Sequence, residues 1–447
     1  MMTGDIFLAY DIRGKVGDQL NPDVSSRVGK ALANWLPEEG PVAVGYDMRP
    51  DSKELAMALI DGLVNQGREV WNIGRVASDM IYFVVGHHGL AGGAVVTASH
   101  NPGEYNGIKL CREQAGGIAL DTGLDEVRDL AIANEFADSD TPGKVVEKDI
   151  MDAWVEHAIG FLDTGELKKF KIAVDAANGM GGLVMPFVQK KLPFEVTEMY
   201  YELDGTFPNH EANPLKPETL VDLQKTVKDN VLDFGVAFDG DGDRAVLIDE
   251  NGVAVSGSVL SAILAEYFLK KKPGSTVLYN AICSNIVRET IEKHGGKPVR
   301  TRVGHTIIKN EMAKHNAVFA GEHSAHYYFE DNFKADSGLV AVMAGIDVLN
   351  KSGMRLSELA DKYRVYVNIP ETNFEVEDKK GTMDRVAEEF SDMEVDWLDG
   401  VTVRFENSSW FNLRPSNTEP LLRLNGEAKN QEDLDELIVK VKAAAGL

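Results

Sequence analysis

Short apolar runs alternate with amphipathic segments along most of the chain. The apolar run 42–46 is followed by Leu55 and two further leucines at four-residue spacing, which share one face of a helix. The preceding segment 21–35 shows the same helical spacing, and further apolar runs follow. Strands that alternate with helices are typical of α/β domains. We therefore predict an α/β domain I over residues 1–146.

The alternation restarts twice beyond this first region. A helical pattern over 150–162 precedes a strand at 171–174, and a later apolar helix precedes a strand at 276–279. These restarts predict an α/β domain II over residues 147–253 and an α/β domain III over residues 254–366. Three diverged copies of one α/β unit would produce such a pattern.

The pattern changes in the last part of the chain. Short apolar runs at 401–405, 410–413 and 421–424 precede a closing amphipathic helix around 434–441. This order predicts a small α+β domain IV over residues 367–447. The expected fold class is therefore α/β, with three related mixed α/β domains and a C-terminal α+β domain around a central cleft.

Three of the predicted strands each end in a polar loop. These loops contain Ser99, Asp239 and Glu322, respectively. In open α/β sheets, ligands bind beyond the carboxyl ends of the strands. A simple hydrogen-bonded turn is the alternative for each loop taken alone. If the three domains face one cleft, the three loops meet there, and the Ser99 hydroxyl lies at the position of a reactive group.

The second polar loop has the composition of a metal site. Asp239, Asp241 and Asp243 alternate with glycines, so a tight turn can aim three carboxylates at one cation. A solvated acidic turn is the plain alternative. A calcium loop of the EF-hand type is disfavoured, because Arg244 stands where that loop needs glycine and the flanks read as strands. Three carboxylates leave room for a phosphate oxygen and waters, which favours Mg²⁺.

A loop near the C-terminus has the composition of a phosphate site. Arg414 offers a bidentate fork, Ser416 and Thr418 offer hydroxyls, and Asn417 lets the loop turn backbone N–H groups inward. Flanking prolines stiffen the loop on both sides. A turn that merely connects two strands is the alternative.

The third polar loop suits a sugar. Glu322 with Ser324 can hydrogen-bond neighbouring sugar hydroxyls, and His323 and His326 add donors. A purely structural role for the two histidines is the alternative.

Composition and net charge indicate which classes of molecule the protein can bind. Hydrophobic residues make up 44% and charged residues 26% of the 447 residues, as in ordinary globular proteins, so we expect a chain that folds throughout. The 71 acidic residues exceed the 46 basic ones, and the net charge of −25 argues against the basic surface that nucleic acids require. We therefore expect small-molecule ligands and no nucleic acid. An anionic substrate would have to meet locally clustered cations.

Cysteine usage and hydropathy favour the cytoplasm. Cys111 and Cys283 lie far apart without metal-type spacing, and the first residues lack the apolar core of a signal peptide. No apolar run reaches the roughly 20 residues that a membrane span needs. We expect a reduced, cytoplasmic protein with no membrane partner, as either a monomer or a homodimer.

Four motifs together resemble the signature loops of the α-D-phosphohexomutases. They occur in that family's order and at fitting spacing, and they span essentially the whole chain. The motifs are Ala98-Ser-His-Asn-Pro102, Asp239-Gly-Asp-Gly-Asp-Arg244, Gly321-Glu-His-Ser-Ala-His326 and Arg414-Pro-Ser-Asn-Thr-Glu419. The third motif, followed by Tyr327-Tyr-Phe329, is most similar to the phosphomannomutase branch, which includes phosphomannomutase/phosphoglucomutase enzymes.

The resemblance implies a heart-shaped, four-domain isomerase. Such an enzyme interconverts mannose 6-phosphate and mannose 1-phosphate, and in this branch also glucose phosphates. A hexose 1,6-bisphosphate would be both intermediate and activator. Ser99 would carry the phosphoryl group as a phosphoserine, and one Mg²⁺ per chain would be held by Asp239, Asp241, Asp243 and the Ser99 phosphate.

The resemblance also implies roles for residues around Ser99. Arg13 and Arg244 would steady the moving phosphoryl group, and His100 would flank the phosphoserine. Lys109 would act as general acid and base on the sugar hydroxyl. Substrate contacts would come from a further set, namely Tyr10, His305, Glu322, His323, Ser324, His326, Arg414, Ser416, Asn417 and Thr418.

One departure from the family pattern and three alternatives stay open. Some relatives carry a substrate-contacting lysine near the position of Ile282, whereas the segment 280–284 contains none. The first alternative is a mutase for hexosamine phosphates. The second is a non-catalytic, metal-dependent sugar-phosphate binding protein, which would have no use for Ser99 and Lys109 beside a metal. The third is a phosphatase, which would have to admit water to the phosphoserine.

Overall fold

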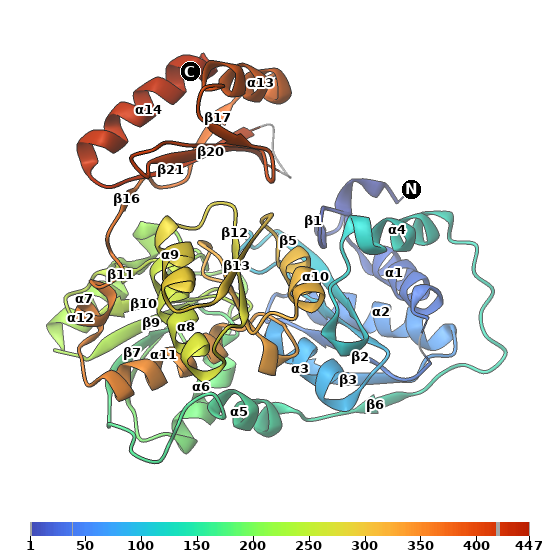
Figure 1. Ribbon diagram of the computed structural model, residues 1–447. Coiled ribbons are helices and arrows are strands. Elements are labelled where there is room, and N and C mark those ends of the chain that lie inside the picture. The colour runs from blue at the N-terminus through green and yellow to red at the C-terminus, as the bar shows by residue number, and fades with distance from the viewer. Residues whose placement is uncertain (1, 38, 417–420, 447) are drawn as a thin grey trace.

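The computed structural model describes residues 2–37, 39–416 and 421–446. Within these residues the chain forms four β-sheets, each accompanied by its own helices (Figure 1). Three sheets share a mixed α/β architecture, and the fourth belongs to a smaller C-terminal domain. The predicted fold class is confirmed.

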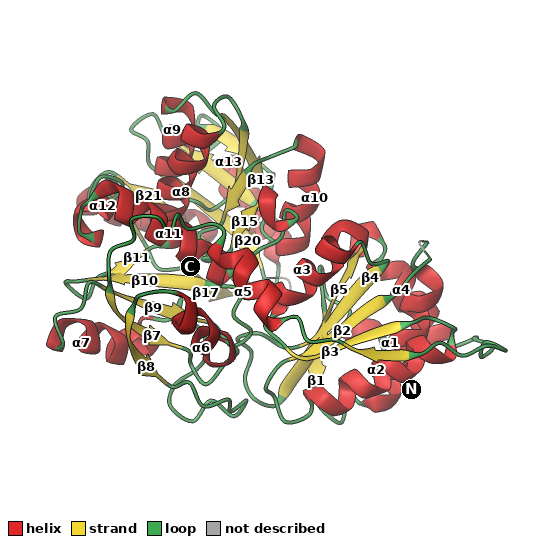
Figure 2. Ribbon diagram, turned by 90° about the horizontal axis from the view of Figure 1, so that it is seen from below, coloured by secondary structure: helices red, strands yellow, loops and turns green. Residues whose placement is uncertain are grey.

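The first sheet carries helices on both faces (Figure 2). Its strands, in spatial order, are β1 (Ile12–Lys15), β5 (Tyr105–Arg112), β4 (Gly92–Val96), β2 (Val42–Tyr46), β3 (Val70–Arg75) and β6 (Val145–Glu147). Its helices are α1 (Pro22–Trp35), α2 (Ser52–Asn65), α3 (Ser78–His88) and α4 (Leu124–Ala133). Along β2, Val42 and Val44 pack in the core with α1 and α2, whereas Ala43 packs in the core with α3. This alternation is the period-two pattern of a strand covered on both faces. The edge strand β6 lies in a polar stretch that gave no strand signal.

The second sheet has one strand fewer. Its order is β11 (Ala254–Val255), β10 (Ala245–Asp249), β9 (Phe234–Phe238), β7 (Lys171–Asp175) and β8 (Glu195–Met199). Its helices are α5 (Met151–Ile159), α6 (Gly181–Lys191) and α7 (Val221–Asp229).

The third sheet has four strands. Their order is β13 (Lys297–Thr301), β12 (Thr276–Asn280), β14 (Phe319–Gly321) and β15 (Tyr327–Phe329). Its helices are α8 (Gly257–Lys271), α9 (Asn285–Lys293), α10 (His305–His315), α11 (Gly338–Ser352) and α12 (Leu356–Ala360). Side chains of Ser256, Ser284 and Ser337 cap the N-termini of α8, α9 and α11, which explains where these helices begin.

The same strand pairing recurs in all three sheets. In each, one strand pairs in parallel with the next two strands along the chain, and the last of these then pairs with an antiparallel strand. The strands before the antiparallel return are β4, β9 and β14. Each of them leads into one of the three polar loops. This repeat of topology is what three copies of one unit predict, although their sequences do not show it.

The C-terminal domain is built around a fourth, mainly antiparallel sheet. Its strands are β16 (Val367–Asn368), β17 (Thr372–Glu375), β18 (Glu394–Asp396), β19 (Val401–Arg404), β20 (Trp410–Pro415) and β21 (Leu421–Ala428). Its helices are α13 (Lys379–Glu389) and α14 (Gln431–Ala445). Figure 1 shows this domain above the other three, joined to them by the chain that rises from α12 to β16.

The apolar cores join the first three units to one another but not to the C-terminal domain. One large core combines α3 of the first unit with the second and third units, as where Phe83 and Trp154 approach to 5.4 Å between ring centroids. The C-terminal domain has a core of its own. Polar contacts link that domain to the third unit, including an ion pair of Arg300 with Asp396 at 2.7 Å. The first three units thus pack as one body, and the C-terminal domain is attached separately.

Helices α1 and α2 cross so closely that glycine is required at the contact. A Cβ atom at Gly29 would lie 2.2 Å from the Leu59 carbonyl oxygen, and one at Gly62 would lie 2.2 Å from the Ser26 carbonyl oxygen. We therefore expect Gly29→Ala to destabilise domain I by about 1–3 kcal/mol and to lower the Tm in thermal unfolding.

Gly345 in α11 provides the matched control for this prediction. It is also a helical glycine, but its added Cβ would find its nearest neighbour at 3.6 Å. Gly345→Ala should therefore leave Tm unchanged or raise it, because alanine favours the helix by up to about 1 kcal/mol. Equal Tm values for the two variants would contradict the close crossing.

Candidate active site

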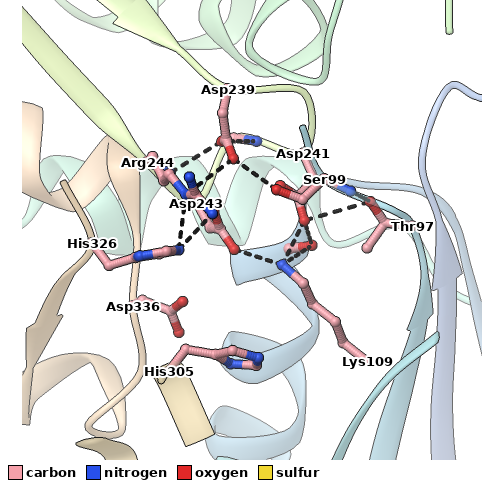
Figure 3. Close-up of polar contacts among 12 residues, drawn as sticks. Thr97, Ser99, Lys109, Asp239, Asp241, Asp243, Arg244, His305, His326 and Asp336 are labelled. Atoms are coloured by element: carbon pink, nitrogen blue, oxygen red, sulfur yellow. Dashed lines mark hydrogen bonds and ion pairs between the residues drawn. The ribbon is translucent and has the colours of Figure 1, made fainter. Parts of the chain in front are cut away.

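The three polar loops meet at one place (Figure 3). The Ser99 hydroxyl donates a hydrogen bond to Asp239 Oδ2 at 2.9 Å, which joins the first and second loops. Arg244 and His326 form an isolated antiparallel bridge, which joins the second and third loops. The repeated topology therefore brings together residues that are more than 200 positions apart in the sequence.

Ser99 is held in an unusual backbone conformation. Its φ of 49° lies in the left-handed region, which a residue with a side chain rarely adopts. The Thr97 hydroxyl accepts a hydrogen bond from the Ser99 N–H at 2.9 Å, and Arg49 donates to the Ser99 carbonyl oxygen at 2.9 Å. These two contacts fix the turn, and the turn aims the buried hydroxyl at Asp239.

Arg49 is a supporting residue that sequence reasoning missed. Besides Ser99, its guanidinium donates to the carbonyl oxygens of Asn101, Pro102 and Tyr105, at 2.6, 2.9 and 2.9 Å. Asp47 pairs with Arg49 at 3.4 Å and keeps it in place. A usable signal was present, because both residues directly follow the apolar strand β2, as Ser99 follows β4.

One more cation and an imidazole border the serine loop. Arg13 on β1 donates to Asp11 at 2.8 Å and to the Asn101 side chain at 2.6 Å, and it also contacts the Ala98 carbonyl oxygen. His100 Nδ1 lies 3.1 Å from the Ser99 hydroxyl. Burial and the nearby arginines lower the pKa of His100, so this imidazole is neutral at pH 7.

The three carboxylates form a compact, water-excluded cluster. Oxygens of Asp239, Asp241 and Asp243 lie within 4.8 Å of one another, and all three residues are buried. Lys109 on β5 reaches between them, with its Nζ 2.6 Å from both Asp241 and Asp243. Burial and the two neighbouring carboxylates raise the pKa of Asp239 well above its usual range. So many buried negative charges require cations close by.

The cluster fits a hard cation. Asp241 Oδ1 and Asp243 Oδ1 are buried and accept no hydrogen bond within the described part of the chain. Carboxylate oxygens without donors are the ligands that Mg²⁺ or Ca²⁺ takes. A second group, formed by Asp243, His326 and Asp336, is a weaker candidate, because Lys309 already pairs with Asp336 at 2.7 Å.

Glu322 is a buried acceptor fixed from three sides. Asn280 and Tyr328 donate to its carboxylate at 2.9 and 2.8 Å, and His326 Nδ1 lies 3.2 Å away. Burial opposes the charge, but these partners hold the pKa of Glu322 at about 2. Glu322 is therefore ionised at pH 7 and can accept hydrogen bonds from a ligand.

His326 connects the carboxylate cluster with Glu322. Its Nε2 lies 3.5 Å from Asp243 and 3.1 Å from Arg244 Nε. Burial and Arg244 oppose a positive charge on the imidazole, whereas Asp243 and Glu322 favour it and raise the pKa of His326 to about 9. The Ser324 hydroxyl lies 3.0 Å from Nδ1 of the same ring.

His323 has the opposite character. It contacts Asn280 at 3.4 Å, and burial lowers the pKa of His323 to about 4. The charge of Glu371 in the C-terminal domain opposes this lowering of the His323 pKa, whereas the charge of Arg414 adds to it. His323 is a neutral donor or acceptor at pH 7.

Tyr10 and His305 form a separate aromatic pair. Their rings meet edge to face, with centroids 5.2 Å apart. His305 begins α10 after Gly304, and its Nδ1 lies 3.4 Å from Lys309 Nζ. Burial and the charge of Lys309 lower the pKa of His305, so this ring is neutral as well. Its buried Nε2 atom accepts or donates no hydrogen bond within the described residues.

The phosphate-type loop lies at the end of β20 in the C-terminal domain. Arg414 is buried and donates to Glu371 at 2.9 Å, and Glu371 also pairs with Arg423 at 3.2 Å. Ser416 is buried, and its N–H donates to the Leu421 carbonyl oxygen at 2.8 Å. The predicted residues Asn417 and Thr418 lie outside the described residues. Sequence reasoning missed Glu371, because nothing in its sequence neighbourhood marks it as a partner of Arg414.

Hydropathy gives one further result. Within residues 2–37, 39–416 and 421–446, no helix has both the length and the apolar character needed to cross a membrane.

Comparisons with known proteins agree with this arrangement. Residues 4–138, 152–252 and 256–366 match the alpha/beta/alpha domains I, II and III of the phosphoglucomutase/phosphomannomutase family, and residues 371–444 match its C-terminal domain. Phosphohexose mutases of Xanthomonas campestris pv. campestris are 41% identical over 439 residues, 97% of each chain.

Two further relatives show the same full-length similarity. A phosphomannomutase of Vibrio cholerae is 37% identical over 457 residues, which cover 97% of this chain and 98% of the relative. The crystal structure of a phosphoglucomutase/phosphomannomutase family protein from Burkholderia thailandensis superposes with a TM-score of 0.91 at 29% identity, covering 100% of this chain and 98% of that one. The chain therefore belongs to the phosphoglucomutase/phosphomannomutase family.

Proposed function

We propose that this protein is a phosphohexomutase that interconverts mannose 6-phosphate and mannose 1-phosphate and also acts on glucose phosphates. One observation carries the proposal: the hydroxyl of Ser99, in a strained turn, contacts a buried three-carboxylate cluster that also binds Lys109. A nucleophile, a cation site and a proton donor thus lie in one contact network. The names of the relatives support this activity.

The cation in the proposal is Mg²⁺, one per chain. Asp239, Asp241, Asp243 and a phosphate on Ser99 would hold it, since the three carboxylates converge and the Oδ1 atoms of Asp241 and Asp243 accept no hydrogen bond among the described residues. When bound, Mg²⁺ supplies positive charge that neutralises the phosphoryl oxygens during transfer.

The chain's own residues would carry out the transfer. The bond between Ser99 Oγ and phosphorus breaks as a sugar hydroxyl oxygen bonds to the same phosphorus. Lys109, whose ammonium lies 2.6 Å from Asp241 and Asp243, would pass a proton to one of these carboxylates as it takes the proton of that hydroxyl, and the reverse step returns both protons. Arg13 and Arg244 border the serine loop and the cluster, where they steady the moving group, and neutral His100 lies beside it. The hexose 1,6-bisphosphate formed then returns its other phosphate to Ser99.

Substrate recognition would come from the third loop and the C-terminal domain. Ionised Glu322 accepts hydrogen bonds from two sugar hydroxyls, and Ser324 lies beside it. Arg414 and Ser416 bind the phosphate group that does not react. The remaining proposed contacts are Tyr10, His305, His323, His326, Asn417 and Thr418. The four segments that match the family fall inside the domains proposed at 1–146, 147–253, 254–366 and 367–447.

The cation requirement gives the first functional prediction. Removal of divalent cations with a chelator should abolish mutase activity, and added Mg²⁺ should restore it, because the phosphoryl oxygens otherwise lack the positive charge that neutralises them during transfer. Asp241→Asn should raise the Mg²⁺ concentration for half-maximal activity by at least about tenfold.

Asp175→Asn serves as the control for this prediction. Asp175 is also a buried aspartate, and it ends the neighbouring strand β7 but lies outside the cluster. Its variant should keep the Mg²⁺ requirement of the unchanged protein. Activity that survives exhaustive chelation would show that the cluster has only a structural role.

The sugar specificity gives the second prediction. Mannose and glucose differ only at C2, and a single net hydrogen bond is worth about 0.5–1.5 kcal/mol, or roughly tenfold. In a coupled assay, the kcat/KM values for the two 1-phosphates should therefore lie within about one to two orders of magnitude of each other. Glu322→Gln should weaken both substrates in parallel.

The same assay with glucosamine 1-phosphate and N-acetylglucosamine 1-phosphate tests the proposed function itself. Both should be poorer substrates than mannose 1-phosphate. Faster turnover of either would favour a hexosamine phosphate mutase instead, and no turnover of any of the four would favour a binding protein. A ratio of kcat/KM between mannose and glucose 1-phosphates above about 10⁴ would show that buried polar groups contact the C2 hydroxyl.

A further inference from the structure

A large cavity lies between the third unit and the connector to the C-terminal domain. Its volume is about 1220 Å³, and α8, α9, α11 and α12 contribute to its walls. The connector residues Lys362, Tyr363, Val365 and Tyr366 complete it, together with Lys429 of the C-terminal domain. Figure 1 shows these helices beside the chain that rises from α12 to β16. None of the lining residues belongs to the candidate active site.

The cavity is strongly basic, although the protein is acidic. Among the described residues, six lysines and two glutamates line it, in a chain with a net charge of −25. The lysines are Lys270, Lys271, Lys293, Lys351, Lys362 and Lys429. Such a local excess of cations attracts anions despite the overall charge of the molecule.

Most of these cations are not neutralised by the protein. Lys270 pairs with Glu266, and Lys351 pairs with Asp347 at 2.9 Å. The other four lysines have no carboxylate within ion-pair distance among the residues that the structure describes. The two glutamates are already engaged, since Tyr363 donates to Glu266 and Tyr366 donates to Glu289. Four ammonium groups around one cavity can therefore serve an external anion with several charges.

The walls also offer surface for a ring. Tyr267, Tyr363 and Tyr366 line the cavity, together with aliphatic side chains such as Ile263 and Leu359. Tyrosines stack on the planar rings of ligands, and the apolar side chains would shield such a ring from water. A ligand that uses both features carries several phosphates and an aromatic ring.

We propose that this cavity is a binding site for a nucleoside polyphosphate and that its occupancy stiffens the connector to the C-terminal domain. The second part follows from the position of Tyr363 and Tyr366. Both lie on the connector, and both are tied by their hydroxyls to helices of the third unit. A ligand held between those helices and the connector adds contacts to both. The proposal does not depend on the mutase activity.

Isothermal titration calorimetry with ATP, without added Mg²⁺, tests the binding site. ATP should bind saturably, and Lys293→Glu/Lys362→Glu should weaken binding by at least about tenfold, since two cations become anions. Lys190→Glu/Lys440→Glu makes the same charge change on α6 and α14, outside the cavity, and should bind ATP as the unchanged protein does. All these lysines are exposed, so each variant should fold, and thermal unfolding checks this.

Two further titrations distinguish this cavity from the candidate active site and a nucleotide from a bare polyphosphate. Arg414→Ala should bind ATP with unchanged affinity, whereas a loss there would place the nucleotide in the candidate active site and overturn the proposal. Inorganic triphosphate should bind at least about tenfold more weakly than ATP, because it lacks the ring. Equal affinities of the two would overturn the nucleoside assignment.

Hydrogen exchange tests the effect on the connector. ATP should slow the exchange of backbone amides in residues 363–368 of the unchanged protein but not of Lys293→Glu/Lys362→Glu. Binding without slower exchange would overturn the coupling. Absence of saturable ATP binding, or equal binding by both double variants, would overturn the site itself.

Discussion

Three buried carboxylates at one point are the constraint on which the rest of this site depends. Asp239, Asp241 and Asp243 are excluded from water, and like charges this close are tolerated only with cations beside them. Two cations form ion pairs with them, namely Lys109 from the first sheet and Arg244 from the loop itself. Because the carboxylates follow β9 and Lys109 lies on β5, their neutralisation also joins the first and second units. The carboxylates are therefore neutralised only when the first and second units are packed together.

The molecule divides its functional groups between a rigid part and an attached one. The loops with Ser99, the aspartates and Glu322 stand on units that share a large apolar core, so packing fixes their mutual distances. Arg414 stands on a domain with a separate core, which meets the third unit through polar contacts. A phosphate group bound by Arg414 would thus be held by a part of the protein that can change position without disturbing the cluster.

The sequence predicts part of this arrangement, and the elements and contacts that it does not predict were missed for physical reasons. Short apolar runs predicted strands such as β2, β7 and β12, helical spacing predicted helices such as α1, α2 and α5, and polar loops after apolar strands located Ser99 and the aspartates. The strand β6 escaped because it is a short edge strand with exposed residues, which carries no apolar signal. Arg49 and Glu371 escaped for another reason. Their partners are backbone carbonyls and a distant arginine, and such contacts exist only after folding.

In the proposed reaction, Ser99 carries the phosphoryl group. The most direct measurement is to react the purified protein with a hexose 1,6-bisphosphate and to map the added phosphate by peptide mass spectrometry. We expect one phosphate per chain, located on Ser99. We also expect Ser99→Ala to fold with unchanged Tm but to take up no phosphate and to lose turnover. Phosphate on another residue, or full turnover by Ser99→Ala, would contradict this role of Ser99.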